Sequence, residues 1–293
     1  MKKIKKMHPI RNIILILIAL TFLIPFLLVI SISVTDADSI VKSGYRLIPE
    51  VFNISAYRMA LKNPQQLIRS YEVTVFYSII GTCLSLIVQS MLAYALSRKE
   101  YRFRNAITVY LLITMLFSGG LVPSYILITK YLHLNNTIWV YIIPGLVSAW
   151  HVIIIRTFFG GLPDGIVEAA RIDGAVETLI FVRIILPLSK PVLATVGFML
   201  LLGKWNDWST TLIYINNTRL YSLQYLLQKI LREAEFLKSM ANTGVGGMLD
   251  GMSGQTDNMK FAMAILAAGP MLVVFPFFQK YFTKGLTVGS VKG

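Results

Sequence analysis

The sequence has 293 residues, of which 55% are hydrophobic and only 14% charged, and its mean hydropathy is +0.65. A water-soluble domain of this length does not need so much apolar surface, so the composition indicates a membrane protein. The net charge of +14 does not indicate nucleic-acid binding, because the Lys and Arg residues fall between long apolar runs and not on one stripe. A single cysteine, Cys83, provides neither a disulfide framework nor a thiolate metal site, and we expect it to pack as a small hydrophobe.

The first apolar run, residues 13–33, follows a basic segment at residues 1–12. It is too long for the apolar region of a signal peptide, and no small-residue cleavage pattern follows it. About 20 apolar residues suffice to cross a hydrocarbon core of about 30 Å. The run is therefore predicted to be a retained membrane helix.

Five further apolar runs follow, at residues 73–97, 107–132, 138–159, 191–208 and 261–281. The chain is thus predicted to be an all-α membrane protein with six transmembrane helices. Lys and Arg gather beside the spans at residues 1–11, 97–105, 163–191 and 280–285, which the positive-inside rule places in the cytoplasm together with both termini.

The opposite face receives residues 35–71, a turn at 133–136 and the stretch 209–260. Within this stretch, residues 222–239 have apolar residues at helical spacing, which predicts an amphipathic helix on the outer surface. Residues 242–258 are rich in Gly and polar side chains, which predicts a flexible connection. We divide the chain into 1–71 (cytoplasmic N-terminus, first membrane helix and outer segment), 72–281 (transmembrane domain) and 282–293 (cytoplasmic tail).

Helix breakers interrupt several of the spans. They either produce kinked packing or mark hinges and a translocation path, and the sequence leaves both interpretations open. The positions are Pro25, residues 118–124, Pro144 with Gly145, Gly269 with Pro270, and Pro276.

The inner loop 163–191 is polar in an otherwise apolar chain. Pro163 and Asp164 suit the first turn of a helix, and Gly174 suits the left-handed position just past its end. A short helix of two to three turns is therefore predicted, with the chain turning into the fifth span at Pro187 and Pro191.

The side chains of this short helix allow two interpretations. Glu168 and Arg171 are three residues apart and can pair, while adjacent Ala169 and Ala170 let another protein approach the backbone closely. The helix would then be a contact for a partner. Alternatively, it is a surface helix that rests on the lipid headgroups.

A second cluster, "KWNDW" at residues 204–208, lies near the outer end of the fifth span. Aromatic faces stack on sugar rings, and Asn206 and Asp207 can hydrogen-bond hydroxyl groups. The alternative is that Trp205 anchors the helix at the membrane interface while Lys204 pairs with Asp207. In the fourth span, Trp150 and His151 are further candidates, although a lone membrane His is more often satisfied by a neighbouring helix.

The inner loop resembles the EAA loop of binding-protein-dependent ABC importer permeases, EAAxxDGAxxxxxFxxIxLPxxxP. The residues that match are Glu168, Ala169, Ala170, Asp173, Gly174, Ala175, Phe181, Ile184, Leu186, Pro187 and Pro191. Residues 93–105, 117–125 and 204–215 further resemble the carbohydrate-uptake, maltose-type branch, and the likeness is closest to permeases for complex oligosaccharides.

The resemblance implies a type I ABC importer transmembrane domain, in a cell membrane, that moves a carbohydrate. It implies four kinds of partner: a second homologous permease, two ATP-binding subunits, an extracellular solute-binding lipoprotein and the sugar. It also implies a coupling helix that docks on the ATPase. The residues themselves, apart from the resemblance, suggest a set of substrate-path or binding-protein contacts. The former comprises Glu168, Ala169, Ala170, Arg171, Asp173, Gly174 and Ala175, and the latter Trp150, Lys204, Trp205, Asn206 and Asp207.

The chain itself is not expected to be an enzyme or to hold a cofactor. It contains no GxxxxGK[ST] phosphate loop and no metal-ligand spacing, so ATP and Mg²⁺ are expected on the partner subunits. The alternatives are a membrane enzyme for lipid-linked sugars and a self-contained carrier. These would need clustered polar residues at one face or ionisable residues deep in the spans, where the sequence offers almost none besides Lys204.

Overall fold

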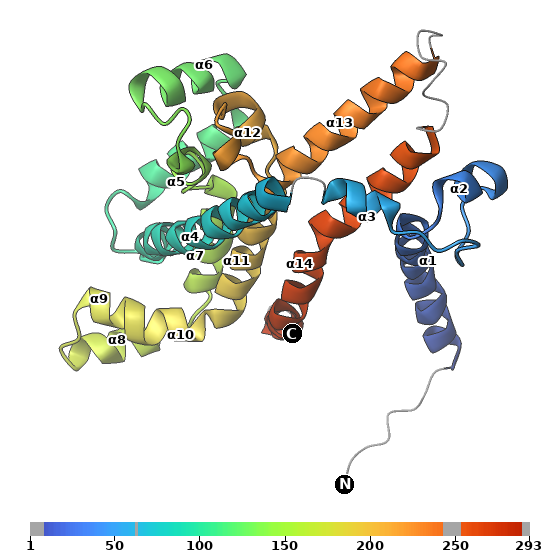
Figure 1. Cartoon of the computed structure of the whole chain (residues 1–293). Helices are drawn as coiled ribbons and strands as arrows, with labels where there is room; N and C mark the ends of the chain where they lie inside the picture. The colour runs from blue at the N-terminus through green and yellow to red at the C-terminus, as the bar shows by residue number, and fades with distance from the viewer. Residues whose placement is uncertain (1–8, 62–63, 243–252, 289–293) are drawn as a thin grey trace. The chain divides into compact units, whose positions relative to one another are not determined.

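Helices make up the described part of the chain, which in this computed structural model comprises residues 9–61, 64–242 and 253–288 (Figure 1). Within these ranges no strand is present, and the only extended pairing is an isolated bridge between Thr35 and Phe52. The contacts divide the chain into two units, Met1–Pro64 with Leu227–Pro270, and Gln65–Leu226 with Met271–Gly293. Each unit is described by itself below.

The first unit contains α1 (Pro9–Ser33), α2 (Ala37–Ser43) and α3 (Ser55–Ala60), with parts of α13 (Leu223–Asn242) and α14 (Ser253–Val288). Asp36 begins α2 by accepting the Asp38 N–H at 3.1 Å, and it also accepts the amide of Asn53 at 2.7 Å. The amide of Asn258 donates to the carbonyl of Thr35 at 2.5 Å, which joins α14 to the end of α1. The predicted amphipathic helix at 222–239 is confirmed as α13.

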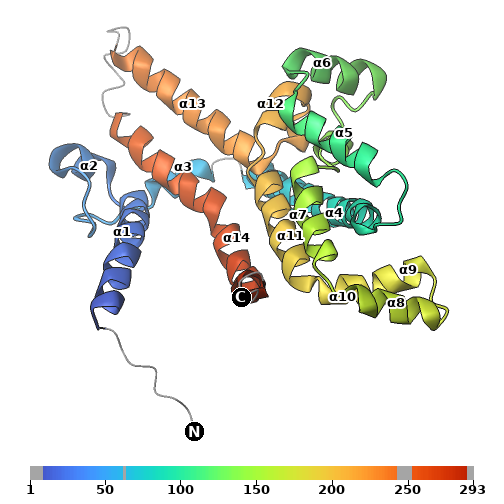
Figure 2. The same ribbon diagram turned by 180° about the vertical axis from the view of Figure 1, so that it is seen from behind.

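The second unit is built on α4 (Pro64–Ser97), α7 (Ala149–Gly160) and α11 (Lys190–Trp205), which pack around one apolar core. Figure 2 shows α7 and α11 side by side. Leu96, Ile155, Phe159 and Val196 are fully or almost fully buried there. The remaining elements are α5 (Arg104–Leu116), α6 (Leu121–Ile126), η1 (Leu127–Tyr131), η2 (Ile138–Tyr141), α12 (Ser209–Tyr214), η4 (Thr218–Leu220) and the helices of the inner loop.

The described residues contain three helices that are long and apolar enough to cross a membrane: Asn12–Ser33, Pro64–Ser97 and Asn258–Gln279. Two pairs of helices reach that length only together. Arg104–Leu116 and Leu121–Tyr131 are bent by 114°, and Glu177–Leu188 and Lys190–Trp205 by 81°. The described structure therefore has three to five candidate spans, and the predicted number of six is not confirmed.

Two predicted spans are interrupted where the sequence has helix breakers. The run 107–132 breaks at 117–120, where Gly120 has a φ of +83° that disfavours other residues. The run 138–159 consists of η2, an irregular stretch containing Pro144 and Gly145, and the 12-residue α7. By contrast, α14 continues through Gly269, Pro270 and Pro276 without interruption.

The structure tests further predictions about the turn at 133–136, Cys83 and the connection at 242–258. The turn at 133–136 is confirmed, with left-handed backbone at His133 and Asn136. Cys83 is exposed on α4, so the expectation that it is packed was wrong for the described chain. Residues 243–252 of the predicted flexible connection lie outside the described residues, and from Ser253 the chain is already helical.

Candidate functional site

The inner loop begins with α8 (Asp164–Ile172), as the sequence predicts. Asp164 lies in its first turn, where a negative charge favours the positive end of the helix dipole. At the other end, the N–H of Gly174 donates to the carbonyl of Arg171 and that of Ala175 to the carbonyl of Ala170, both at 3.0 Å. These two bonds form a Schellman motif, and the φ of +80° at Gly174 confirms its predicted left-handed conformation.

After Gly174 the chain returns through α9 (Glu177–Ile180), the π-helical turn η3 (Phe181–Ile185) and α10 (Leu186–Leu188). Ser189 ends α10 and begins α11, and the chain bends there by 81°. This bend lies between Pro187 and Pro191, where the sequence predicts the turn into the fifth span. α8, α9 and α10 lie together at one end of α11 (Figures 1 and 2).

The short helix α8 has an inner and an outer face. Val167 and Ala170 are buried in the core of the second unit, whereas Glu168 and Ala169 are exposed. Ile172 also lies on the face of α8 that points away from the core, and it is 86% exposed. Of the two alanines expected to admit a partner, only Ala169 faces outward, because the phase of the helix turns Ala170 towards the core.

Ion pairs tie the inner loop to the α4–α5 connection. Arg171 donates to Glu177 at 2.7 Å and contacts Glu100 at 3.4 Å, and Lys99 pairs with Asp164 at 3.0 Å. The pair predicted between Arg171 and the exposed Glu168 is not formed, because the Arg171 guanidinium is turned to these other carboxylates. Lys99 lowers the pKa of Asp164, and the hydrogen bond to Glu177 raises the pKa of Arg171. These pairs join α8 to the α4–α5 connection, and because they are exposed they contribute little to folding stability.

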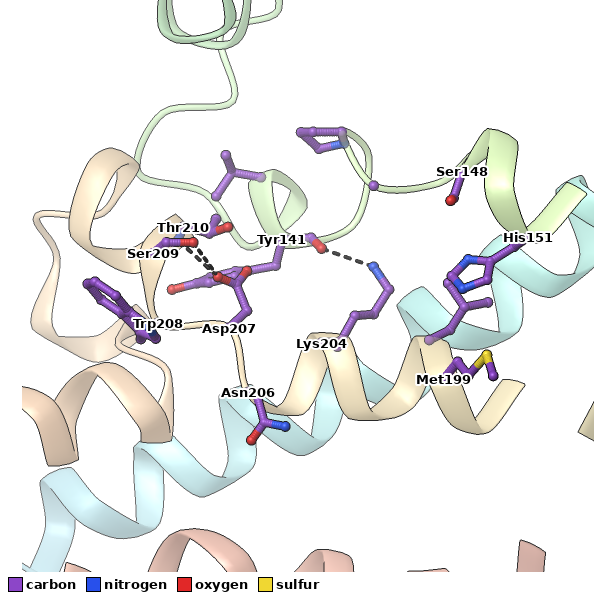
Figure 3. A pocket seen from close by; sticks show the side chains of 15 residues that line it. Tyr141, Ser148, His151, Met199, Lys204, Asn206, Asp207, Trp208, Ser209 and Thr210 are labelled. Atoms are coloured by element: carbon purple, nitrogen blue, oxygen red, sulfur yellow. Dashed lines mark hydrogen bonds between the residues drawn. The ribbon is translucent and has the colours of Figure 1, made fainter. Parts of the chain in front are cut away.

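The second candidate site is a cavity of about 490 Å³ in the second unit (Figure 3). It lies between the irregular stretch before α7, the end of α11 and the start of α12. Of the predicted contacts, Lys204, Asn206 and Asp207 line it together. Trp150 and Trp205 do not line it, since Trp150 is 57% exposed on α7 and Trp205 is buried in the core at 3% exposure.

Further lining residues escaped prediction, among them Tyr141, Ser148 and Thr210. Tyr141 and Ser148 are far from Lys204 in the sequence. Thr210 lies at the start of α12, a short helix that a hydropathy profile does not reveal. The only signal was Pro144 with Gly145, which breaks the helix between Tyr141 and Ser148. His151 also lines the cavity, and its Nδ1 atom has no hydrogen-bond partner in the described chain.

A hydrogen-bond network fixes the lysine and the acid of this cavity. The carboxylate of Asp207 accepts the Ser209 hydroxyl at 3.1 Å and the Thr210 N–H at 3.0 Å, so it caps the start of α12. The ammonium of Lys204 donates to the carbonyl of Tyr141 at 3.3 Å (Figure 3). The predicted pair between Lys204 and Asp207 is therefore not formed, because each is held by other groups.

Neither site presents a metal centre. Within the described ranges, no group of three or more His, Cys, Asp or Glu residues could hold a metal ion. The first site offers the exposed face of α8 for contact with a partner, and the second offers a polar cavity for a ligand.

The comparisons with known proteins agree over most of the chain. The permease protein YtcP of the polygalacturonan/rhamnogalacturonan transport system of Bacillus subtilis is 35% identical over 279 residues, covering 95% of this chain and 96% of that relative. Protein LplC of the same organism is 36% identical over 271 residues, covering 92% of this chain and 90% of the relative.

A solved structure also matches. A bacterial ABC transporter involved in the import of the acidic polysaccharide alginate has a chain with a TM-score of 0.78 and 28% sequence identity, covering 93% of this chain and 95% of that one. The family described as binding-protein-dependent transport system inner membrane component matches residues 90–288, which include both candidate sites. The chain therefore belongs to the family of binding-protein-dependent transport system inner membrane components.

Proposed function

We propose that the chain is the permease subunit of an ABC importer that moves an oligosaccharide from an extracellular binding protein into the cytoplasm. The relatives named above include a polygalacturonan/rhamnogalacturonan transport permease, and a further one, AraQ of Bacillus subtilis, belongs to an arabinooligosaccharide transport system. The observation that carries the proposal is α8, a short helix capped at its end, whose exposed face carries Glu168 and Ala169 of the EAA motif.

The coupling role is assigned to Glu168, Ala169, Ala170, Arg171, Asp173, Gly174 and Ala175. We propose different tasks for these residues, according to their burial and contacts. Glu168 and Ala169 would contact the ATPase, whereas Ala170 and Gly174 would fix the helix to the bundle and Arg171 would link it to the α4–α5 connection. Coupling of this kind requires an ATPase that contacts α8 differently in its two states.

Six membrane spans are part of the same proposal. The three long helices and the bent pair Arg104–Leu116 with Leu121–Tyr131 account for four of them, and α11, the second helix of the other bent pair, for the fifth. The sixth would be α7, which with η2 and the irregular stretch before it occupies the fourth predicted span. With six spans, both termini and α8 lie in the cytoplasm, as the distribution of Lys and Arg requires.

The cavity beside Lys204 is proposed as part of the sugar path. Non-helical backbone at membrane depth is tolerated only where protein buries it or where it lines a water-filled cavity. The irregular stretch at Pro144 and Gly145 lines this cavity. The path would be completed by a second homologous permease, and ATP with Mg²⁺ would bind to two partner ATPases.

Purification and reconstitution test the proposal. The tagged chain, expressed with its neighbouring transport genes, is expected to retain a second permease and an ATPase in mild detergent. In proteoliposomes this assembly, supplied with the binding protein, should take up oligosaccharide only when ATP is present. Uptake by the chain alone without ATP would instead support a self-contained carrier, and turnover of lipid-linked sugar would support a membrane enzyme.

A further inference from the structure

Lys204 places an ammonium at the cavity, and none of the carboxylates in the described residues forms an ion pair with it. Within the described residues its one hydrogen bond is to the carbonyl of Tyr141, at 3.3 Å. Asp207, the acid that lines the same cavity, is turned to Ser209 and Thr210, and no described residue forms an ion pair with Lys204. A cation among apolar helices is costly to keep unpaired, so such residues commonly serve a ligand or an ion path.

Residues of the neighbouring helices fix the position of the Lys204 side chain. A Cβ atom added to Gly81 on α4 would lie 2.8 Å from Cε of Lys204, so a larger residue there would push the lysine aside. At the backbone, the hydroxyl of Tyr77 donates to the carbonyl of Lys204 at 3.0 Å, and the ring of Tyr77 stacks on that of Tyr141 at 4.4 Å. Both the start and the end of the lysine side chain are thus fixed.

The walls of the cavity suit a sugar that carries one negative charge. An ammonium has three donors, and only one of those of Lys204 is used within the described structure. A single ammonium fits a monovalent carboxylate better than a phosphate, for which sites commonly gather several cations or backbone donors. Trp208 offers an aromatic side chain for the rest of the ring, and the volume of the cavity lies within the roughly 300–1,000 Å³ typical of ligand sites.

We infer that Lys204 binds the carboxylate of an acidic sugar residue, of the uronic acid class, on its way through the cavity. The inference rests on the proposed function and narrows it from oligosaccharides in general to acidic ones. Two of the matched proteins have names that agree with this chemistry, the polygalacturonan/rhamnogalacturonan permease and the importer of the acidic polysaccharide alginate.

Binding to the purified, assembled importer in the absence of its binding protein tests the inference, because the binding protein then cannot impose its own preference. The probes are a galacturonic acid trimer and its uncharged methyl ester, measured by equilibrium dialysis. The wild-type importer is expected to bind the acid about tenfold more tightly than the ester, since hydrogen bonds to charged groups contribute the most. Lys204→Gln should lower the affinity for the acid to that for the ester and leave the ester unchanged.

Two control variants sharpen this test. Lys204→Arg keeps the charge and should retain a preference for the acid. Lys130→Gln removes an exposed lysine of η1, outside the cavity, and should bind both probes like the wild type.

Three results would overturn the inference. They are a wild type without preference, a preference that survives in Lys204→Gln, and an equal loss for both probes, which would mark a purely structural lysine. The proposed function survives these results if ATP still drives oligosaccharide uptake. Only an assembly that neither binds nor takes up any sugar would remove both.

Discussion

An importer carrying Gly174→Pro is expected to hydrolyse ATP without moving sugar, while the permease still reaches the membrane. Gly174 has a φ of +80°, which proline, fixed near −65°, does not adopt. Proline also lacks the N–H that Gly174 donates to the carbonyl of Arg171. The end of α8 would therefore open locally, and the outward face would lose its fixed position without a change in the membrane helices.

Uptake and ATPase rates are measured on the same proteoliposomes. Uptake is expected to fall by more than about tenfold, the factor that corresponds to 1.4 kcal/mol. The ATPase rate should no longer respond to the sugar-loaded binding protein. Gly174→Ala should be intermediate, because a left-handed conformation costs an L-residue about 1–2 kcal/mol. The matched control is Gly165→Ala in the first turn of the same helix, where a Cβ meets open space and the variant should behave like the wild type. Coupled uptake by Gly174→Pro at the wild-type level would contradict the role assigned to this helix end.

Glu168→Lys is also expected to abolish ATP-driven uptake, but by weakening the contact between α8 and the ATPase. Glu168 is exposed on the outer face of α8, and its carboxylate makes no hydrogen bond or ion pair within the described chain. Reversing its charge should leave folding almost unchanged, since exposed substitutions of this kind usually alter stability by no more than about 0.5 kcal/mol. At a contact with the ATPase, however, a like-charge juxtaposition costs several kcal/mol.

The expected result is a permease that is present in normal amounts but no longer retains the ATPase during purification. The matched control is Glu72→Lys, the same charge reversal on an exposed residue of α4, whose ion pair within the described residues is with Arg69. That variant should retain the ATPase. If Glu168→Lys also retained it and transported normally, the outer face of α8 would not be the contact.

Local features of the inner loop could be predicted from the sequence because they depend on neighbouring residues. The start of α8 at Asp164, its end at Gly174 and the bend between Pro187 and Pro191 all follow from backbone preferences of a few residues. Which alanine faces outward did not follow, because the phase of a short helix becomes known only with the core against which it packs.

Contacts over long separations in sequence could not be predicted. Arg171 pairs with Glu100, 71 residues away, and Lys204 donates to Tyr141, 63 residues away, where the sequence offered only the near partners Glu168 and Asp207. The sequence marked the helix breakers at residues 118–124 and at Pro144, but it did not show that the helices end there. Hydropathy averaged over a window stays high across Gly120 and across Pro144, although the backbone there is not helical.

Cross-linking at two adjacent positions tests most directly the claim that α8 is the contact with the ATPase. The single cysteine, Cys83, is first replaced by serine, and Ala169→Cys and Ala170→Cys are then made separately in that background. Ala169 is exposed and Ala170 is buried, so a thiol-specific cross-linker should join the ATPase to the Ala169→Cys permease and not to the Ala170→Cys permease. Absence of the cross-link at position 169 in an assembly that still takes up sugar with ATP would contradict the account.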